Sequence, residues 1–310
     1  MKTLLLTTAL VALSCIGVAR ATALPATCAH VEVASSQPHG TGTLAGHGYD
    51  LSLAGNADRT FHAADIAATG TGLDPQALRD MEDVASLVLL ATLTGHHSEG
   101  CARDYFTSAA TPIMAGLRAG HSYDLTWQGG VLTSGETKLS FRRAHLHLAG
   151  AQGDSTPATL TLDTQGIGIT GTHNTLLASA LPQQATANAS VPGSALVPLA
   201  IAITGHPTQG VMVPLHVASL NAQRGAMQIT GNGDANLTGN TDASSATGHI
   251  QVQNLDAVID TLRNAGQTRA SAALVLAKLF GHKAASGGTS WDVSWEGGVM
   301  TVNHIPLPIH

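Results

Sequence analysis

Apolar and polar residues alternate with a period of two along most of the chain. Tyr49, Leu51 and Leu53 share one side of such a segment, whereas Asp50 and Ser52 share the other. Short alternating segments separated by Gly, Asn and Asp predict half-buried strands of an antiparallel sheet. The alternation recurs at Val31 and Val33, Leu160 and Leu162, Ile167 and Ile169, Ile201 and Ile203, Val211 to Val217, Met227 and Ile229, and Ile250 and Val252.

The alternation changes phase within residues 139–148. Leu139 and Phe141 share one side, but Leu146 and Leu148 continue in the opposite phase, across Arg142 and Arg143. We therefore expect a bulge or a bend at these two arginines.

Helical spacing of apolar residues appears in four places. A first helix begins at the cap Asp74 with Pro75 in its first position, and Gly95 ends it. A second runs from Leu255 to Leu262 with apolar residues three and four apart, and Gly266 breaks it. Further helices are expected over 271–280, ending at Gly281, and between residues 103 and 117, interrupted at Pro112.

The segment 178–214 differs in composition from the rest. Proline lacks the amide donor that a sheet ladder needs, so the segment is interpreted as edge strand, surface crossing or linker. Its prolines are Pro182, Pro192, Pro198, Pro207 and Pro214.

An eleven-residue stretch occurs twice. Residues 123–133 read YDLTWQGGVLT and residues 291–301 read WDVSWEGGVMT, with six identical positions. Each copy is interpreted as a β-hairpin whose two adjacent glycines form the turn, Gly129 and Gly130 in one copy and Gly297 and Gly298 in the other. Trp127 and Trp295 are then packing anchors between helix and sheet, each worth several kcal/mol, roughly 3–5; the alternative is a platform on which a ligand stacks.

The sequence thus predicts a mainly β protein with helices (α+β). A long curved antiparallel sheet carries helices on one face and consists of two strand-helix-hairpin pseudo-repeats, at about residues 40–135 and 225–310. Residues 24–310 are expected to form a single domain.

The C-terminal residues resemble a known family. Three segments follow one another within residues 227–308, namely ITGNGDANLTG, HIQVQNLDAVIDTLRNAG and WDVSWEGGVMTVNHIPLP. They resemble the bacterial exported family called domain of unknown function 2125 and, more distantly, the AsmA-like envelope proteins. His304 stands where that pattern expects Gly. The resemblance implies an extended curved sheet, a periplasmic location and an association with lipid handling, and it supplies no catalytic residues.

The N-terminus reads as an export signal. Lys2 precedes a short apolar run that ends at the small residues Ala21 to Ala23, so we expect cleavage after Ala23 and a periplasmic protein without a transmembrane span. An uncleaved anchor, or a lipoprotein attached through Cys15, is the alternative. In an oxidising compartment Cys28 and Cys101 are expected to form a disulfide, the alternative being two buried thiols.

Composition narrows the functional classes. Only 11% of the 310 residues are charged and the net charge is −6, which opposes nucleic-acid binding. Gly166, Gly168 and Gly171 match a dinucleotide-binding pattern, but the acidic residue that should follow is absent, so a glycine-rich hairpin turn is expected and no cofactor.

Histidine supplies the one candidate for metal chemistry. The chain has 16 His, and His145 and His147 project from the same side of a predicted strand, as zinc or copper ligands do. The alternative is that these histidines take the place of Lys and Arg as polar side chains on the protein surface.

These observations favour a non-catalytic envelope protein that holds a lipid or another apolar ligand. A structural or protein-interaction module of the envelope is the alternative, and an unrecognised enzyme is kept as a third hypothesis. Whether the hollow of the sheet is filled by the chain's own helices or left open separates the first two.

Overall fold

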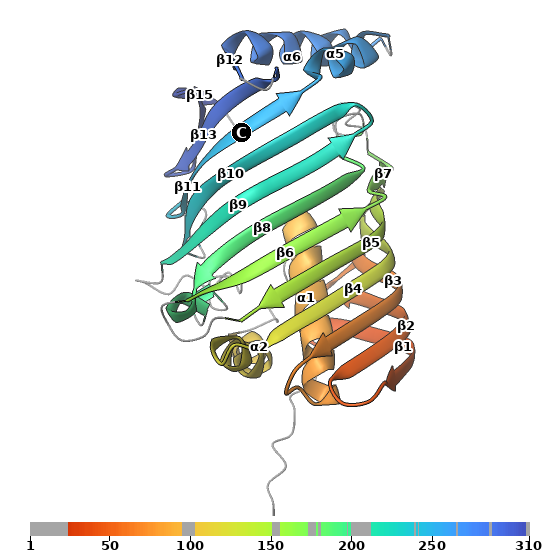
Figure 1. Cartoon of the computed structure of the whole chain (residues 1–310). Coiled ribbons are helices and arrows are strands. Elements are labelled where there is room, and N and C mark those ends of the chain that lie inside the picture. Colours follow the sequence, from red (N-terminus) through yellow and green to blue (C-terminus); the bar gives the residue numbers. More distant parts are fainter. Residues whose placement is uncertain are drawn as a thin grey trace, which may run out of the picture.

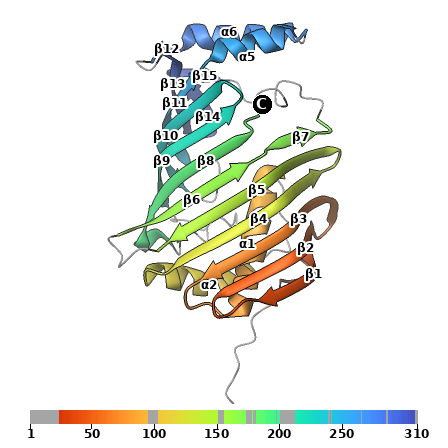
Figure 2. The same ribbon diagram turned by 45° about the vertical axis from the view of Figure 1, so that its right-hand side comes forward.

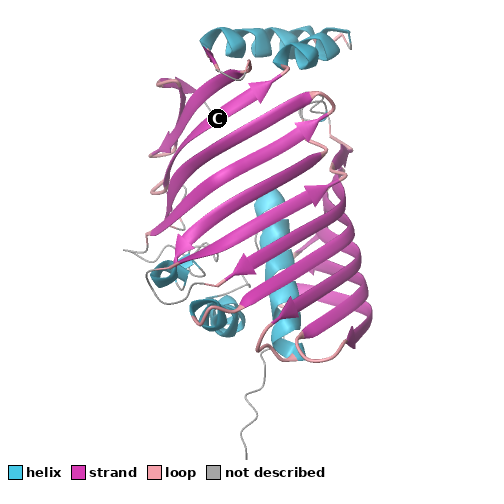
Figure 3. Cartoon of the chain, in the orientation of Figure 1, coloured by secondary structure: helices cyan, strands magenta, loops and turns pink. Residues whose placement is uncertain are grey.

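The sheet dominates the molecule. The computed structural model describes residues 24–94, 103–150, 156–172, 178, 181–196, 198–199, 212–238, 240, 242–264, 266–284 and 287–307. In this part of the chain, one open antiparallel sheet of fifteen strands curves along its length, and four helices accompany it (Figures 1 and 3). The prediction of a mainly β fold with one long antiparallel sheet is confirmed.

Neighbouring strands in the sheet are mostly neighbours in sequence. The order is β1-β2-β3-β4-β5-β6-β8-β9-β10-β11-β13-β14-β15, with β7 beside β5 and β12 beside β13. The first strands are β1 (Ala29–Pro38), β2 (Thr43–Leu53), β3 (Asn56–Gly70), β4 (Ser122–Ser134), β5 (Thr137–Ala149), β6 (Pro157–Gln165), β7 (Gly168–Thr170) and β8 (Gln184–Pro192). The remaining strands are β9 (Val213–Arg224), β10 (Met227–Leu237), β11 (Ser245–Gln253), β12 (His282–Lys283), β13 (Thr289–Glu296), β14 (Val299–Val302) and β15 (Ile305–Leu307).

The helices lie at two separate places. They are α1 (Pro75–Thr94), α2 (Arg103–Arg118), α5 (Leu255–Asn264) and α6 (Thr268–Phe280), with a short 3₁₀ turn η1 at Gly193–Ala195. Helix α1 crosses the inner face of β2, β3 and β4, whereas α5 and α6 lie together at the other end of the sheet (Figures 1 and 2).

Helix α1 begins as the sequence predicts. The Asp74 carboxylate accepts hydrogen bonds from the backbone N–H groups of Gln76 and Ala77, at 3.0 and 2.8 Å. These two donors have no partner inside the helix, so the cap satisfies them. Helix α2 is present where it is expected, but the predicted interruption is wrong, because the helix continues through Pro112, which is exposed on its surface.

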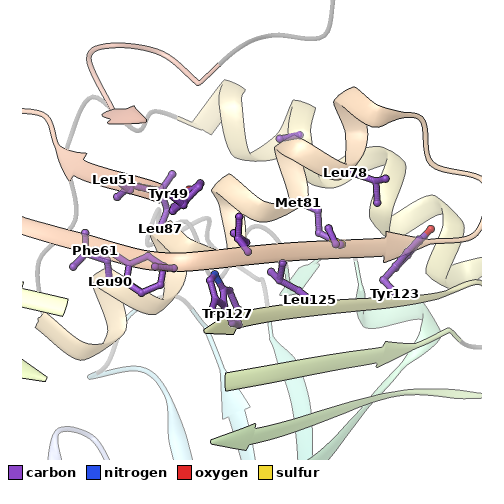
Figure 4. Packing of buried hydrophobic residues seen from close by; sticks show 14 of the residues in the cluster. Tyr49, Leu51, Phe61, Leu78, Met81, Leu87, Leu90, Tyr123, Leu125 and Trp127 are labelled. Atoms are coloured by element: carbon purple, nitrogen blue, oxygen red, sulfur yellow. The ribbon is translucent and has the colours of Figure 1, made fainter. Parts of the chain in front are cut away.

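The main core lies between α1 and the N-terminal strands. Leu78, Met81 and Leu90 on α1 belong to one buried cluster with the residues of the sheet beneath, where Leu78 lies near Tyr123 and Leu90 lies near Phe61 (Figure 4). The Phe61 ring contacts three aromatic neighbours, which are Tyr49, Trp127 and Phe141. This half of the inner face is therefore filled by the chain itself.

One face of the sheet can be followed from this core to the C-terminal end. Trp127 faces Ala144 on β5, and the antiparallel register carries the same face through β6, β8, β9, β10 and β11. It arrives at Trp291, Val293 and Trp295 on β13. The inner face under α1 and the face that carries Trp295 are thus one continuous surface.

A row of residues crosses the N-terminal strands where the alternation changes phase. We call it the glycine row; it consists of residues that lie opposite one another on adjacent strands, namely Ala34, Gly48, Ala64, Gly129, Arg142 and Gly166. On β5, Phe141 and Ala144 are both buried although they are three residues apart, and β2, β3 and β4 show the same change. The β4–β5 register is unchanged on both sides of Arg142, so the predicted phase change is present as a bend rather than a bulge.

Glycine in this row is required by geometry. Gly48, Gly129 and Gly166 have positive φ, and a Cβ added to Gly129 lies 3.0 Å from the Cβ of Ala64. Gly166 separates β6 from β7, which share one register against β5. The hairpin turn expected at Gly166, Gly168 and Gly171 is therefore wrong, since the chain continues along β5 in the same direction.

The repeated motif forms two different structures. Gly297 and Gly298 form the predicted turn between β13 and β14, both with positive φ. Gly129 and Gly130 do not, because β4 continues through them and turns only after Ser134. The Phe141 ring of β5 packs against Gly130, where any Cβ would lie about 2 Å from it. The internal duplication itself stays a prediction.

The proline-rich segment is also placed differently from its prediction. Strand β8 lies between β6 and β9 in the interior of the sheet, not at an edge. Its prolines are compatible with this position, because Pro182 precedes the strand and Pro192 is its last residue. The strand predicted at Ile201 and Ile203 lies outside the described residues.

Candidate functional site

The inner face changes from filled to open along the sheet. Over β9, β10, β11, β13 and β14 it is hollowed into a groove of about 290 Å³, which we call the inner groove. Its lining is almost entirely apolar. The largest side chains that line it are Val217, Leu220, Ile250, Val293, Trp295 and Met300.

Small residues make the groove possible. Gly231, Gly233 and Gly248 line its floor, and Ala235 faces Ala246 across the β10–β11 pair. On β2 to β4 the corresponding face carries Tyr49, Phe61 and Trp127, which fill the space beneath α1. The difference in side-chain volume explains why one half of the surface is a packed core and the other a depression.

The three tryptophans have different environments. Trp127 is 2% exposed and donates its indole N–H to Ser86 Oγ on α1, at 3.0 Å. Trp291 is 9% exposed and donates to the Ala277 carbonyl on α6, at 2.9 Å. Trp295 is half-buried and lines the inner groove. The predicted anchor role therefore fits Trp127, whereas Trp295 also presents its ring to the groove.

A buried acidic cluster lies on α1, where the sequence pattern predicts only an apolar stripe. Asp83 accepts a hydrogen bond from the Tyr49 hydroxyl at 3.0 Å, and Asp80 accepts one from Gln76. Glu82 is buried, and its Oε1 has no hydrogen-bond partner. The sequence does contain a signal for this cluster. Residues 80, 82 and 83 are all acidic, so some of these carboxylates must lie next to the apolar side of the predicted helix.

Burial dominates the electrostatics of this cluster. Desolvation, and then the charge of Asp83, raise the pKa of Glu82 to about 8. Desolvation also raises the pKa of Asp83 to about 6, against the opposing effect of the hydrogen bond from Tyr49. At pH 7 Glu82 is therefore mostly neutral, whereas Asp83, whose carboxylate accepts the hydrogen bond from Tyr49, is mostly ionised.

The outer face carries histidines paired with aspartates on neighbouring strands. His62 Nδ1 lies 2.8 Å from Asp50, His216 Nδ1 lies 2.8 Å from Asp234, and His249 Nδ1 lies 2.8 Å from Asp292. His47 contacts Asp65 in the same way. The hydrogen bond from His249 is the main cause that lowers the pKa of Asp292.

The two metal-ligand candidates belong to this pattern. His145 Nε2 and His147 Nδ1 both hydrogen-bond the same oxygen of Asp124, at 3.0 and 2.8 Å. Within the described ranges, no set of three His, Cys, Asp or Glu side chains is arranged to hold a metal ion. Both imidazoles are thus paired with a carboxylate on the neighbouring strand, and their role as metal ligands stays a hypothesis.

Cys28 is buried at the start of the sheet, next to the first residue of β1. Its expected partner Cys101 lies outside the described residues, as does Cys15, so the disulfide stays a prediction.

None of the described helices is long and apolar enough to span a membrane.

Comparison with known proteins returns nothing similar: no family model, no curated protein and no solved structure matches this chain. The resemblance to the exported family and to AsmA-like proteins stays a prediction.

Proposed function

We propose that this chain is an exported, non-catalytic envelope protein that holds the hydrocarbon chain of a lipid in the inner groove. The observation that carries the proposal is the groove itself, an apolar depression on the same face that α1 covers over β2, β3 and β4. Binding sites for small molecules are typically concave and mostly apolar, with volumes of about 300–1,000 Å³. The periplasmic location rests on the predicted signal peptide.

The dimensions of the groove agree with one hydrocarbon chain. It crosses five strands, and strands lie about 4.8 Å apart, which gives a length of about 19 Å. A bilayer's hydrocarbon core is about 30 Å thick and contains two leaflets, so one acyl chain extends about 15 Å. The groove floor offers backbone and apolar side chains but no buried charge, as an alkyl chain requires.

Filling the groove tests the proposal. The fluorescent fatty acid cis-parinaric acid is titrated into wild type and into Ala235→Phe, whose ring occupies the groove. We expect saturable binding by wild type and an affinity at least about tenfold weaker in the variant. Ala246→Phe fills the same space from the facing strand and should behave alike.

The neighbouring position on the same strand provides the control. Asn236 is exposed on the outer face, so Asn236→Phe should bind the probe as wild type does. Thermal melting of all four forms verifies that each is folded. Wild type that does not bind the probe, or binding that Ala235→Phe and Ala246→Phe leave unchanged, rejects the proposal.

The edges of the sheet favour a second candidate, a protein-interaction module. β1 pairs with β2 on one side, and β15 pairs with β14 on one side, so both end the sheet among the described strands. Unpaired strand edges add strands from partners. A periplasmic pull-down that captures the same partner with wild type and with Ala235→Phe supports this role instead of the lipid role.

A further inference from the structure

Helix α6 exposes apolar side chains on the side that faces solvent. Val275, Leu276, Leu279 and Phe280, which we call the α6 face, are four of the nine exposed large hydrophobic residues in the described part of the chain. Leu276 is 55% exposed and Leu279 is 74% exposed. Residues three and four apart lie on one side of a helix, so these side chains form one surface. A helix that is apolar on its outer side as well as its inner side is ordinarily buried on both.

The orientation of α6 is fixed by contacts on its other side. The Trp291 indole N–H donates to the Ala277 carbonyl at 2.9 Å, and Leu274 packs into the cluster beneath α5 and α6. Lys278 Nζ lies 2.6 and 2.7 Å from the two carboxylate oxygens of Asp256 on α5. Turning the apolar side inward would break all of these contacts, so its exposure is built into the fold.

Charge around the α6 face is positive, although the chain is acidic. Residues 255–284 contain four Lys or Arg and two Asp, in a chain of net charge −6. Lys278 and Arg263 are paired with the two aspartates. Arg269 and Lys283 have no acidic partner in the part of the chain that the structure describes, and they stand near the two ends of α6. An apolar surface flanked by cations is complementary to an anionic lipid surface.

The length of α6 determines how it meets such a surface. Its 13 residues extend about 20 Å, less than the roughly 30 Å of a bilayer's hydrocarbon core. The helix therefore lies along the membrane plane and inserts only the α6 face.

We propose that the α6 face docks the protein onto an anionic phospholipid bilayer. Docking places one end of the inner groove beside the lipids, because β13 lies next to α6 (Figure 1). On this strand the Trp291 indole bonds α6, and Val293 and Trp295 line the groove. A lipid could then pass from the bilayer into the groove. This transfer rests on the proposed function, whereas the docking itself does not.

Vesicle flotation tests the docking. The purified protein is mixed with vesicles of phosphatidylcholine alone or of equimolar phosphatidylcholine and phosphatidylglycerol. We expect wild type to float with the anionic vesicles and to bind the neutral ones less, with the difference shrinking at high salt. Leu276→Gln/Leu279→Gln should bind the anionic vesicles at least about tenfold less, since two apolar side chains no longer insert. Arg269→Gln/Lys283→Gln should lose the preference for anionic vesicles.

Leu93→Gln is the matched control, because Leu93 is a comparably exposed leucine on α1. It should float as wild type does, and all forms carry an identical N-terminus. Wild type that stays unbound, or a Leu276→Gln/Leu279→Gln variant that floats as well as wild type, overturns the proposal. A dimer in light scattering that the same double variant abolishes also overturns it, since the face then joins two copies. Titration with cis-parinaric acid without vesicles reports the groove separately, so docking and ligand holding fail independently.

Discussion

At the scale of single residues, identical sequence does not ensure identical structure. Trp127 and Trp295 occupy matching positions in the repeated motif, but Trp127 is bonded to α1 whereas Trp295 lines the inner groove. The adjacent glycines also differ, since Gly297 and Gly298 form a turn while Gly129 and Gly130 lie within a strand. The neighbours in space, here Ser86 and Phe141, decide what the motif becomes, and a single sequence does not reveal them.

The two tryptophans should therefore differ in their contribution to stability. Trp127→Ala removes a buried ring and leaves the Ser86 hydroxyl unpaired, so we expect a loss of about 3–5 kcal/mol in the free energy of unfolding. Trp295→Ala should cost roughly half as much, because part of that ring is already in contact with solvent. Urea denaturation measures both. Equal losses contradict the difference in burial, and Trp127→Phe separates ring packing from the hydrogen bond.

Glu82 should make the protein less stable as the pH rises. Folding raises the pKa of Glu82 from 4.5 to about 8. Between about pH 4.5 and pH 8 the carboxyl is ionised in the unfolded chain but still protonated in the folded one, so the free energy of unfolding falls as the pH rises through this range. Glu82→Gln removes this effect. The difference in free energy of unfolding between the variant and wild type should therefore be a few kcal/mol more favourable to the variant at about pH 8 than at about pH 5, since each pKa unit is worth about 1.4 kcal/mol. Melting across this pH range checks it.

The control for this prediction is the exposed Glu32, which is not among the buried acids. Glu32→Gln should follow the pH dependence of wild type. If Glu82→Gln does so too, the buried carboxyl is not the source.

At the scale of elements, the sequence predicts what is determined locally. The Asp74 cap and the stripe that follows it define α1, and the i, i+3, i+4 spacing from Leu255 defines α5. The position of β8 in the middle of the sheet was not predictable. Its sequence, QATANASVP, has only a weak alternation of apolar and polar residues, and the prolines of the segment favoured an edge strand. The continuation of α2 through Pro112 likewise depends on tertiary packing.

The candidate site was predictable only in part. The duplicated motif drew attention to Trp295, which does line the inner groove. The groove itself depends on small residues, Gly231, Gly233 and Gly248, that face the same side on different strands. Their alignment follows from register, which a single sequence does not specify. The histidine pairs are hidden for the same reason, since each joins two strands.

At the scale of the whole molecule, one face changes from core to groove, and the glycine row bends the part that α1 covers. Gly129 has a positive φ, and its added Cβ meets Ala64. Gly55, in the turn between β2 and β3, has a similar φ of 75° but nothing within 4 Å. Comparing the two glycines separates backbone strain from the close approach of strands.

Gly129→Ala should therefore destabilise the fold more than Gly55→Ala. Both substitutions place an alanine in the left-handed region, which lowers the free energy of unfolding by about 1–2 kcal/mol, but Gly129→Ala also forces β3 and β4 apart. We expect an additional loss of about 1–2 kcal/mol in chemical denaturation. Ala64→Gly in the Gly129→Ala background should recover part of it. Equal losses at the two glycines mean that the row is not tightly packed.

The glycine row also constrains how the sequence can diverge. Its members stand opposite one another, so a residue inserted within one strand moves every later side chain of that strand to the other face, unless each neighbour changes too. We therefore expect the fold to tolerate an inserted residue in the turns between these strands and not within the strands themselves.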